Sequence, residues 1–190
     1  MNRPIDVALV YGSARQGRFC EVVARWAAEQ IASREQFTLD HIDPAAAELT
    51  AAQTDAAALA ALKRRIGRAE AFVVVTPEYN HGYPAALKLL IDAVYDEWQA
   101  KPVAFISYGG ASGGIRAIEQ LRLVFAELHA VTLRDAVSFA NAWAQFDASG
   151  ALKDPVGANA AMGIMLARLG WWASALREAR DARAYASAAA

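Results

Sequence analysis

Short runs of apolar residues alternate with longer amphipathic stretches from one end of the chain to the other. Near-continuous apolar runs are typical of strands that are buried on both faces of a sheet. The five runs that we interpret as strands lie at residues 7–11, 37–42, 71–76, 103–108 and 131–139.

The stretches between these runs carry apolar residues at three- and four-residue intervals, as on one face of a helix. They predict helices at residues 19–31, 55–68, 84–98 and 115–129, and one or two closing helices over about 156–185. Strands that alternate with helices form right-handed crossovers. The pattern therefore predicts an α/β fold with a five-stranded parallel sheet that helices cover on both faces.

The chain has 190 residues and shows neither an internal repeat nor a linker. We expect a single domain over residues 1–190, with a helical C-terminal extension from about residue 156. Charged residues interrupt the longest apolar stretches, and the first residues form no long apolar leader. The expectation is a cytoplasmic protein without a membrane span.

Composition narrows the classes of function. The chain has 19 Lys and Arg against 20 Asp and Glu, a net charge of −1, which argues against a polybasic nucleic-acid-binding protein. The one cysteine, Cys20, excludes an intramolecular disulfide framework and a multi-cysteine metal site. His41, His81 and His129 are too scattered to suggest a metal cluster, so no metal is expected.

Three of the predicted strands end in unusual loops, and ligands of open α/β sheets bind beyond the carboxyl ends of strands. The first loop runs from Gly12 to Arg18 and leads straight into a helix. Helix amides together with Ser13, Arg15 and Arg18 would suit a phosphate. The loop lacks the Lys-Ser/Thr end of a Walker A motif and the spacing of a Rossmann fingerprint. The alternative is an ordinary turn with solvated arginines.

The second loop is Pro77-Glu78-Tyr79-Asn80-His81-Gly82-Tyr83-Pro84. Two prolines stiffen it, and Gly82 permits a positive φ. The ring of Tyr79 offers a flat apolar face to a planar ligand. Glu78 fits a hydrogen-bonding or capping role better than that of a general acid. His81 fits a surface or interface residue better than an acid, base or ligand.

The third loop, residues 107–114, holds four glycines, which allow the backbone to approach a ligand closely. Without a Gly-x-Ser-x-Gly elbow, Ser13, Ser107 and Ser112 are poor candidates for a hydrolase nucleophile. Cys20 is interpreted as a small buried side chain rather than a reactive thiol. Trp171 and Trp172 are interpreted as core or subunit packing.

Together the three loops resemble the NADPH-dependent FMN reductases, a flavodoxin-like family that includes chromate, quinone and azo-dye reductases. The resemblance covers roughly residues 5–150 and depends mainly on Gly12-Ser13-x-Arg15 and on the loop from Pro77 to Pro84. It implies a three-layer flavodoxin-like sandwich with strand order 2-1-3-4-5. Arg18 and Cys20 stand where several family members have Ser and Asn.

The resemblance also implies the residues that contact FMN. Ser13, Arg15, Arg18 and Phe19 would surround its phosphate. The isoalloxazine ring would contact Pro77, Glu78, Tyr79 and Asn80, and would be bordered by Ser107, Gly109 and Gly110.

The implied activity is the reduction of a small acceptor by NADPH or NADH in a ping-pong cycle. The acceptor would be free flavin, a quinone, chromate or an azo compound. No catalytic side chain is expected, because the flavin carries the chemistry. The alternatives are a flavodoxin-type electron carrier and a non-catalytic FMN-binding protein. A homodimer or tetramer is expected, with the 84–98 helix in or near the interface. That expectation depends on the apolar residues Leu87, Leu90, Ile91, Val94, Tyr95 and Trp98.

Overall fold

The apolar runs form one parallel sheet in the computed structural model, which describes residues 3–46 and 55–189. The strands are β1 (Ile5–Tyr11), β2 (Phe37–Ile42), β3 (Ala71–Pro77), β4 (Pro102–Gly109) and β5 (Val131–Ala140). Their order is β2-β1-β3-β4-β5, and each of these neighbouring pairs is parallel. The predicted α/β class and the flavodoxin-like strand order are therefore confirmed.

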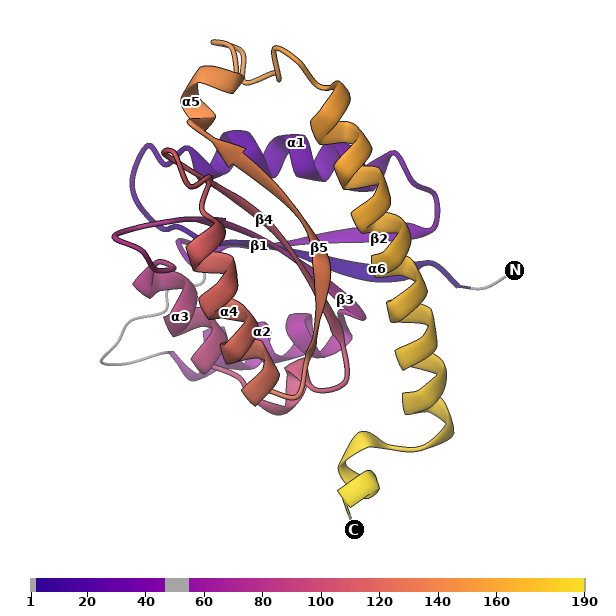
Figure 1. Cartoon of the computed structure of the whole chain (residues 1–190). Helices are drawn as coiled ribbons and strands as arrows, with labels where there is room; N and C mark the ends of the chain where they lie inside the picture. Colours follow the sequence, from indigo (N-terminus) through magenta and orange to yellow (C-terminus); the bar gives the residue numbers. More distant parts are fainter. Residues whose placement is uncertain (1–2, 47–54, 190) are drawn as a thin grey trace.

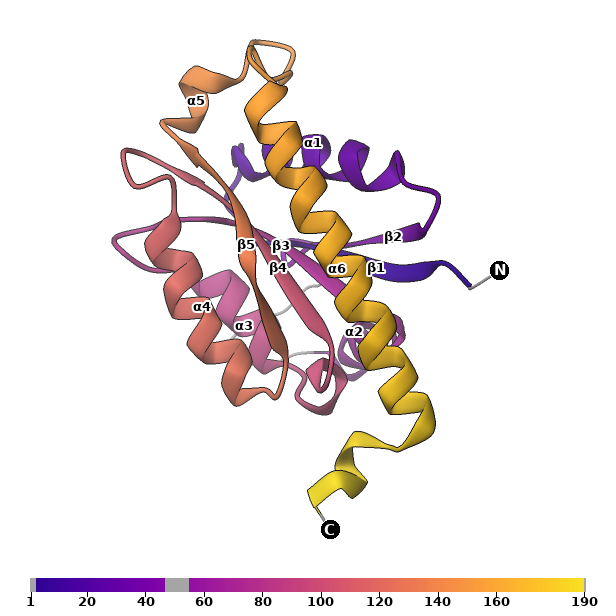
Figure 2. The same cartoon turned by 45° about the vertical axis from the view of Figure 1, so that its right-hand side comes forward.

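Helices cover both faces of this sheet (Figures 1 and 2). On one face lie α1 (Cys20–Ala32) and α6 (Val156–Ala182), and on the other lie α2 (Ala56–Arg68), α3 (Ala85–Asp92) and α4 (Ile115–Glu127). The shorter helices are η1 (Asp96–Trp98), α5 (Ala142–Gln145) and η2 (Tyr185–Ala189). The closing segment is thus one long helix followed by a short 3-10 turn.

The helix predicted over residues 84–98 is wrong in its length. α3 ends at Asp92, and the chain then turns into η1. The cause is Trp98, whose side chain is fully buried and whose indole N–H donates to the carbonyl of Ile91 at 3.1 Å. Its ring packs against Phe72 and Phe125, with centroids 4.6 and 5.4 Å away. Burying this indole requires the chain to fold back.

The apolar surface expected on the 84–98 segment, which motivated the dimer prediction, is absent from the described structure. Five of its six apolar side chains lie in the core and are at most 3% exposed: Leu87, Leu90, Ile91, Val94 and Trp98. Tyr95 alone among the six is exposed. The segment therefore buries these apolar residues within its own chain. The inference that it has more apolar surface than its own core needs is wrong.

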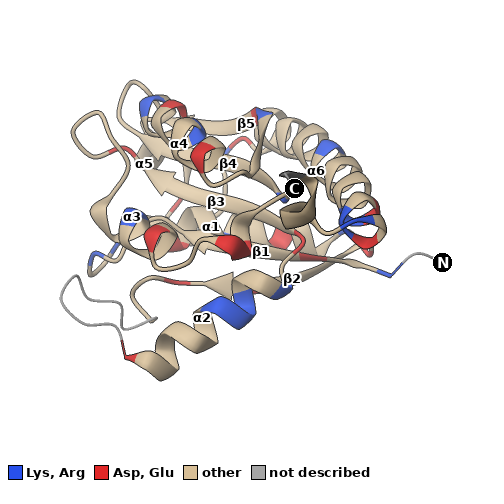
Figure 3. Cartoon of the chain, turned by 90° about the horizontal axis from the view of Figure 1, so that it is seen from below, with Lys and Arg blue, Asp and Glu red and all other residues tan. Residues whose placement is uncertain are grey.

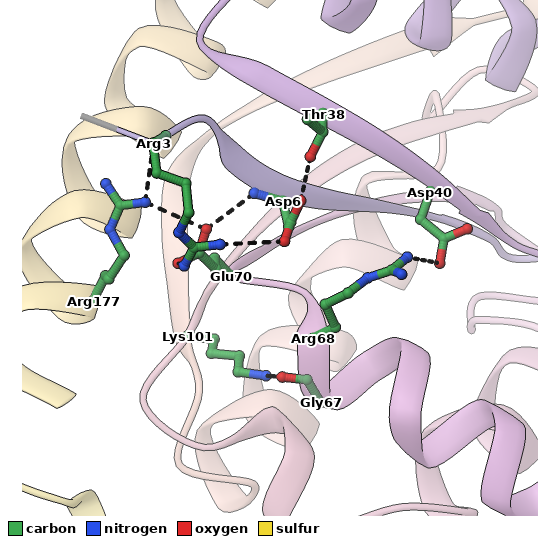
Figure 4. Close-up of polar contacts among 9 residues, drawn as sticks. All are labelled: Arg3, Asp6, Thr38, Asp40, Gly67, Arg68, Glu70, Lys101 and Arg177. Carbon is green, nitrogen blue, oxygen red and sulfur yellow. Dashed lines mark hydrogen bonds and ion pairs between the residues drawn. The ribbon is translucent and has the colours of Figure 1, made fainter. Parts of the chain in front are cut away.

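Buried polar groups fasten the amino-terminal end of the sheet (Figure 4). Glu70, only 5% exposed, accepts hydrogen bonds from the Arg3 side chain at 2.7 Å and from the Asp6 backbone at 3.1 Å. Arg177 of α6 approaches the same carboxylate at 3.4 Å. One carboxylate thus links β1, the start of β3 and the closing helix.

Lys101, beside this cluster, caps α2. Its buried ammonium donates to the carbonyls of Ile66 at 2.9 Å and Gly67 at 2.8 Å. These carbonyls belong to the last turn of the helix, where acceptors lack intrahelical partners. Burial, together with the nearby positive charge of Arg180, lowers the pKa of Lys101 to about 8.

Candidate functional site

Loops that are far apart in the sequence meet at the carboxyl edge of the sheet. They follow β1, β3 and β4, which are neighbours in the strand order, and they lie on the left in Figure 1. The chain changes direction across the sheet between β1 and β3, which makes this edge the topological switch point. The fold therefore brings together the three segments that the sequence singled out.

The first loop depends on a glycine at its start. The N–H of Gly12 donates to the carbonyl of Val75 at 2.7 Å, and a Cβ on Gly12 would lie 2.6 Å from that oxygen. Ser13 follows and is fully buried. Its hydroxyl shares a 2.9 Å hydrogen bond with the hydroxyl of Tyr79. The first loop is thus joined to the second through a buried polar contact.

Arg15 makes a second connection between these loops. Its guanidinium carbon lies 3.7 Å from the centroid of the Tyr79 ring, a cation–π contact. Arg15 is exposed, so its charge remains accessible to a ligand. The ring of Tyr79 is consequently positioned by Ser13 at its hydroxyl and by Arg15 over one face.

The side chain of Arg18 points to a carboxylate of its own chain, whereas the sequence predicted that it would contact a phosphate. Its side chain is 6% exposed and forms a two-pronged ion pair with Asp43, in which Nη1 lies 2.7 Å from Oδ1. Nη1 also donates to the carbonyl of Ser13. The hydrogen bonds with Asp43 raise the pKa of Arg18. Through these contacts, Arg18 stabilises the conformation of the first loop. A direct contact between Arg18 and a phosphate stays a prediction.

Asp43 was not identified from the sequence, although a signal was present. It directly follows β2, and the order 2-1 places the end of β2 beside the end of β1. Burial opposes ionisation of its carboxyl group, but the hydrogen bonds from Arg18 and from the Ala45 backbone outweigh burial and lower the pKa of Asp43.

The N-terminus of α1 is open to a ligand. Among the described residues, no side chain caps it, and Phe19 occupies the N-cap position. The first amides of a helix lack intrahelical partners and attract anions. The Phe19 ring packs edge-on against Phe146, with centroids 5.6 Å apart, and lies 5.9 Å from Tyr108. Phe19 thus forms an apolar wall beside this N-terminus, where the amides of Glu21 and Val22 donate to the carbonyls of Arg18 and Phe19.

The second loop forms a tight turn, with reciprocal backbone hydrogen bonds between Tyr79 and Gly82 at 2.9 and 3.1 Å. The positive φ angles fall on Asn80, at 51°, and His81, at 70°, and not on Gly82, the residue that the sequence singled out as permitting one. Two successive positive φ angles match a type I′ turn, in which Asn is favoured at the first position. The turn exposes Asn80 and His81 to solvent.

Glu78 fastens the second loop to the third. Its carboxylate accepts hydrogen bonds from the Ser112 hydroxyl at 2.9 Å, the Arg116 side chain at 2.7 Å and the Arg116 backbone at 3.2 Å. Burial opposes its ionisation, yet these hydrogen bonds lower the pKa of Glu78. The carboxylate caps α4, which agrees with the predicted capping role. Ser112 and Arg116 are its partners that sequence reasoning missed.

The third loop is compact because glycine occupies positions at its base where a side chain would clash. Gly114 has φ of 84°, and a Cβ there would lie 2.8 Å from the Cβ of Ser107. The buried Ser107 hydroxyl donates to the Gly113 carbonyl at 2.8 Å, so it holds the loop from below. A Cβ on Gly110 would meet no heavy atom within 4 Å. Gly110 thus leaves open space at the rim of the loop.

Cys20 is buried, as interpreted from the sequence. Burial raises the pKa of its thiol, which disfavours the reactive thiolate. Tyr108, which sequence reasoning passed over, lies beside it. The Tyr108 ring is 5% exposed, and its hydroxyl finds no hydrogen-bond partner among the described residues. This residue adds to the apolar base beneath the first loop.

Pro77, the last residue of β3, is buried at the start of the second loop. The predicted site residues from Pro77 to Asn80 therefore lie together with Ser13 and Arg15. Gly109 and Gly110 begin the adjoining loop, whereas the side chains of Arg18 and Ser107 serve the scaffold. An open helix N-terminus, an aromatic ring and glycine-rich backbone at a switch point define a flavodoxin-like protein with a site for a phosphorylated planar ligand.

Comparison with known proteins identifies the family. The family model described as NADPH-dependent FMN reductase matches residues 5–144, and the chain belongs to this family of oxidoreductases. A quinone reductase of Pseudomonas putida is 32% identical over 164 residues, which cover 81% of this chain and 88% of that protein.

An NAD(P)H-dependent FMN reductase of Schizosaccharomyces pombe is 32% identical over 119 residues, covering 57% of this chain and 60% of that protein. Further matches, to the NAD(P)H-dependent FMN reductases of Saccharomyces cerevisiae and a Nectria species, span 31% and 64% of those proteins. The chain thus spans less than two thirds of these three relatives.

The fold is shared with FerB of Paracoccus denitrificans, a flavoenzyme NAD(P)H:(acceptor) oxidoreductase, at a TM-score of 0.71 and 24% identity. That match covers 90% of this chain and 97% of FerB.

Proposed function

We propose that this protein is an NAD(P)H-dependent FMN reductase that reduces a small acceptor in a ping-pong cycle. The observation that carries the proposal is the contrast between two helix N-termini at the same edge. Glu78 caps α4, whereas among the described residues no side chain caps α1. The open N-terminus lies next to Ser13 and Arg15, which suits a phosphate monoester.

The residues present fit FMN. The phosphate would bind the backbone of residues 13–19 and the charge of Arg15. The isoalloxazine ring would lie against the segment from Pro77 to Asn80 and the backbone of Gly109 and Gly110, where open space borders Gly110. Whether each of these residues contacts the cofactor stays a prediction.

FMN, when bound, accepts hydride from the nicotinamide and passes electrons to the acceptor. The protein's own residues position it. Ser13 and Arg15 fix Tyr79, and Glu78 fixes the second loop on the third. The lowered pKa of Glu78 keeps it ionised at neutral pH, so Glu78 supplies hydrogen-bond acceptors rather than a proton. Electron transfer without a side-chain acid agrees with this arrangement.

The relatives support the acceptor class. The names quinone reductase and NAD(P)H:quinone oxidoreductase are carried by the Pseudomonas putida and Solanum tuberosum proteins. We therefore place quinones first among the acceptors, ahead of free flavin, chromate and azo compounds.

The test is steady-state oxidation of NADPH and NADH by the FMN-loaded chain, with quinones, free FMN, chromate and azo dyes as acceptors. Parallel lines in double-reciprocal plots are expected for a ping-pong cycle. An electron carrier or a non-catalytic flavin protein would bind FMN without oxidising either nucleotide at a useful rate. That outcome would overturn the reductase proposal.

Binding is tested separately, with FMN and riboflavin compared on Arg15→Met, which keeps most of the stem and removes the charge. A larger loss of affinity for FMN than for riboflavin is expected, since FMN alone carries the phosphate. Equal losses would remove Arg15 from the phosphate site.

Location and assembly also remain proposals. No helix in the described part of the chain is long and apolar enough to cross a membrane. We propose a cytoplasmic protein that forms a homodimer or tetramer. Sedimentation across a wide concentration range tests the assembly, and a monomer throughout would contradict it.

A further inference from the structure

A fourth loop meets the carboxyl edge of the sheet beside the three loops of the candidate site. It follows β5, the neighbour of β4 in the strand order, and it contains the short helix α5. Figures 1 and 2 show α5 directly beyond the end of β5. The amide of Asn141, just before α5, donates to the carbonyl of Gly110 at 2.9 Å. The segment 141–153, which we call the fourth loop, is therefore joined to the third loop.

Contacts on both sides hold α5 in place. Behind it, the Phe146 ring is 3% exposed and packs against Phe19 and Phe139, with centroids 5.6 and 5.2 Å away. Lys153 donates from its backbone and from its ammonium group to the last two carbonyls of α5, both at 2.9 Å. A helix of four residues is thus tied to the first loop through Phe19 and to its own continuation through Lys153.

One large side chain of α5 is left in solvent. Trp143 is 61% exposed, although the preceding residue, Ala142, is fully buried. Trp143 is two residues from Asn141, so their Cα atoms are at most about 7.6 Å apart. The indole is therefore attached close to the amide that bonds to the third loop. Tryptophan combines a large apolar surface with few rotatable bonds, which makes a fixed, exposed indole a suitable platform for a flat ring.

The strand order places Trp143 and Tyr79 on opposite sides of the third loop. Tyr79 follows β3, Gly110 follows β4 and Trp143 follows β5, and these three strands are neighbours in that order. Adjacent strands are about 4.8 Å apart, so β3 and β5 are separated by roughly 10 Å. Between them, a Cβ on Gly110 would meet no heavy atom within 4 Å. Two aromatic residues thus flank a stretch of bare backbone with open space beside it.

We propose that Trp143 binds the ring of the electron acceptor, a planar and uncharged quinone, at the rim of the third loop opposite Tyr79. This proposal rests on the proposed reductase function. In that reaction NAD(P)H and one proton reduce the quinone to the hydroquinone and leave NAD(P)⁺, and Trp143 itself exchanges neither electrons nor protons. A quinone ring stacks on the indole face, whereas chromate has no ring to stack.

The first test separates the two half-reactions of the ping-pong cycle in the FMN-loaded protein. The acceptor is 2,3-dimethyl-1,4-naphthoquinone, whose methyl groups block addition of a thiol to the ring. Trp143→Ala is expected to lower kcat/KM for this quinone about five- to tenfold, because the stacking surface is lost. The kcat/KM values for NADPH and for ferricyanide, an acceptor without a ring, are expected to stay unchanged.

Trp143→Phe keeps an aromatic face and should retain most of the activity with the quinone. Trp171→Ala is the matched control, since Trp171 is 65% exposed and lies about 22 Å along α6 from its first residue. Figure 3 shows α5 on the left, well apart from the charged end of α6 on the right. The control should leave all three kcat/KM values unchanged. An equal loss with ferricyanide, a loss with NADPH, or no loss with the quinone in Trp143→Ala each overturns the proposal.

The second test measures binding without turnover. Calorimetric titration of the FMN-loaded protein with the same quinone, in the absence of NADPH and NADH, should give a dissociation constant about five- to tenfold higher for Trp143→Ala than for the wild type or Trp171→Ala. Far-ultraviolet circular dichroism shows that each variant is folded. A wild type that binds the quinone through Trp143 but oxidises neither nucleotide would support this binding site and contradict the reductase function. An active wild type whose quinone affinity survives Trp143→Ala overturns the binding site and leaves the reductase function standing.

Discussion

At the scale of single residues, the site depends on contacts that hold Tyr79 rather than on a reactive side chain. The ring is fixed at its hydroxyl by the buried Ser13 and over one face by Arg15. In the proposed site, a planar ligand would therefore meet a ring whose orientation is set before binding. Preorganisation of this kind lowers the entropy lost on association.

The Ser13–Tyr79 hydrogen bond can be measured with a double-mutant cycle. Tyr79→Phe keeps the ring, so FMN affinity is expected to change only a few-fold, while the free energy of unfolding falls by about 1 kcal/mol. Tyr79→Ala removes the stacking surface and should weaken FMN by more, on the order of 1 kcal/mol beyond burial.

Urea unfolding of Ser13→Ala, Tyr79→Phe and the double variant gives the coupling energy, expected near 1 kcal/mol. Additive losses would mean that the two hydroxyls do not interact. If Phe and Ala slowed single-turnover flavin reduction equally at matched FMN occupancy, Tyr79 would be an acid rather than a positioning residue.

Arg18 and Arg15 are expected to separate into a structural and a ligand-binding arginine. Arg18→Met leaves the Asp43 carboxylate, whose side chain is 23% exposed, without its partner, so the free energy of unfolding should fall by about 1–3 kcal/mol. Arg15→Met should leave stability nearly unchanged, because Arg15 is exposed. Urea unfolding of the two variants at pH 7 checks this difference.

The pH dependence has a definite sign. The pKa of Asp43 is lowered in the folded chain, so its pairing contributes stability above its ordinary pKa of about 4 and loses it as the pH falls through the folded value. The penalty of Arg18→Met should therefore shrink in acid. A penalty that stays constant into strong acid would show that the ion pair is not its source.

At the scale of elements, the sequence predicted where strands lie better than how helices end. Buried apolar runs mark strands directly, and β3 and β4 extend only one residue at an end beyond their predicted ranges. The end of α3 was missed because it depends on Trp98 returning to the core, a tertiary contact. The turn after β3 was placed correctly, but its positive φ angles fall on Asn80 and His81, whose side chains tolerate that region less readily than glycine.

Lys101 shows how one buried cation can make the end of a helix sensitive to pH. Its pKa is lowered to about 8, mainly by burial, against about 10.4 in an unfolded chain. Between these values the unfolded chain binds more protons, so the free energy of unfolding rises with pH through this interval. Across this pH interval, the titration of Lys101 is expected to raise the free energy of unfolding by on the order of 3 kcal/mol.

The comparison variant is Lys101→Met, which keeps the length of the side chain and cannot titrate. The stability of the wild type relative to this variant should rise between pH 8 and pH 10 in urea unfolding. Lys88→Met is a useful control, since the Lys88 side chain is 39% exposed and pairs with Asp92 on the surface. A flat difference for Lys101→Met would place the Lys101 pKa near its ordinary value.

At the scale of the whole molecule, the site exists only because the strand order makes neighbours of β1, β3 and β4. The sequence identified all three loops, since glycines, prolines and polar residues at strand ends are visible in one dimension. It did not show that Arg18 turns to Asp43 or that Ser107 holds Gly113, because both contacts depend on packing. Nor did it show that Trp171 stands on the surface rather than in the core.

A ligand that joins loops from three strands should stabilise the entire fold. Binding to the folded chain alone adds about 2.7 kcal/mol at a free concentration of 100 times the dissociation constant. For a chain of 190 residues, each kcal/mol raises Tm by roughly 2–4 °C, so saturating FMN is expected to raise Tm by about 5–10 °C. Riboflavin at the same concentration should raise it less, because it lacks the phosphate that the open end of α1 is expected to hold.

Differential scanning calorimetry of the chain with FMN, with riboflavin and without ligand makes this measurement. Arg15→Met supplies the control. At a common FMN concentration, the Tm of Arg15→Met should rise less than the Tm of the wild type. When each protein is given FMN at the same multiple of its own dissociation constant, the two Tm shifts should agree. That pair of results would attribute the difference to affinity alone. An unchanged Tm at FMN concentrations that saturate a fluorescence titration would mean that the flavin binds the unfolded chain as well as the folded one, which a site built from three separate strand ends does not allow.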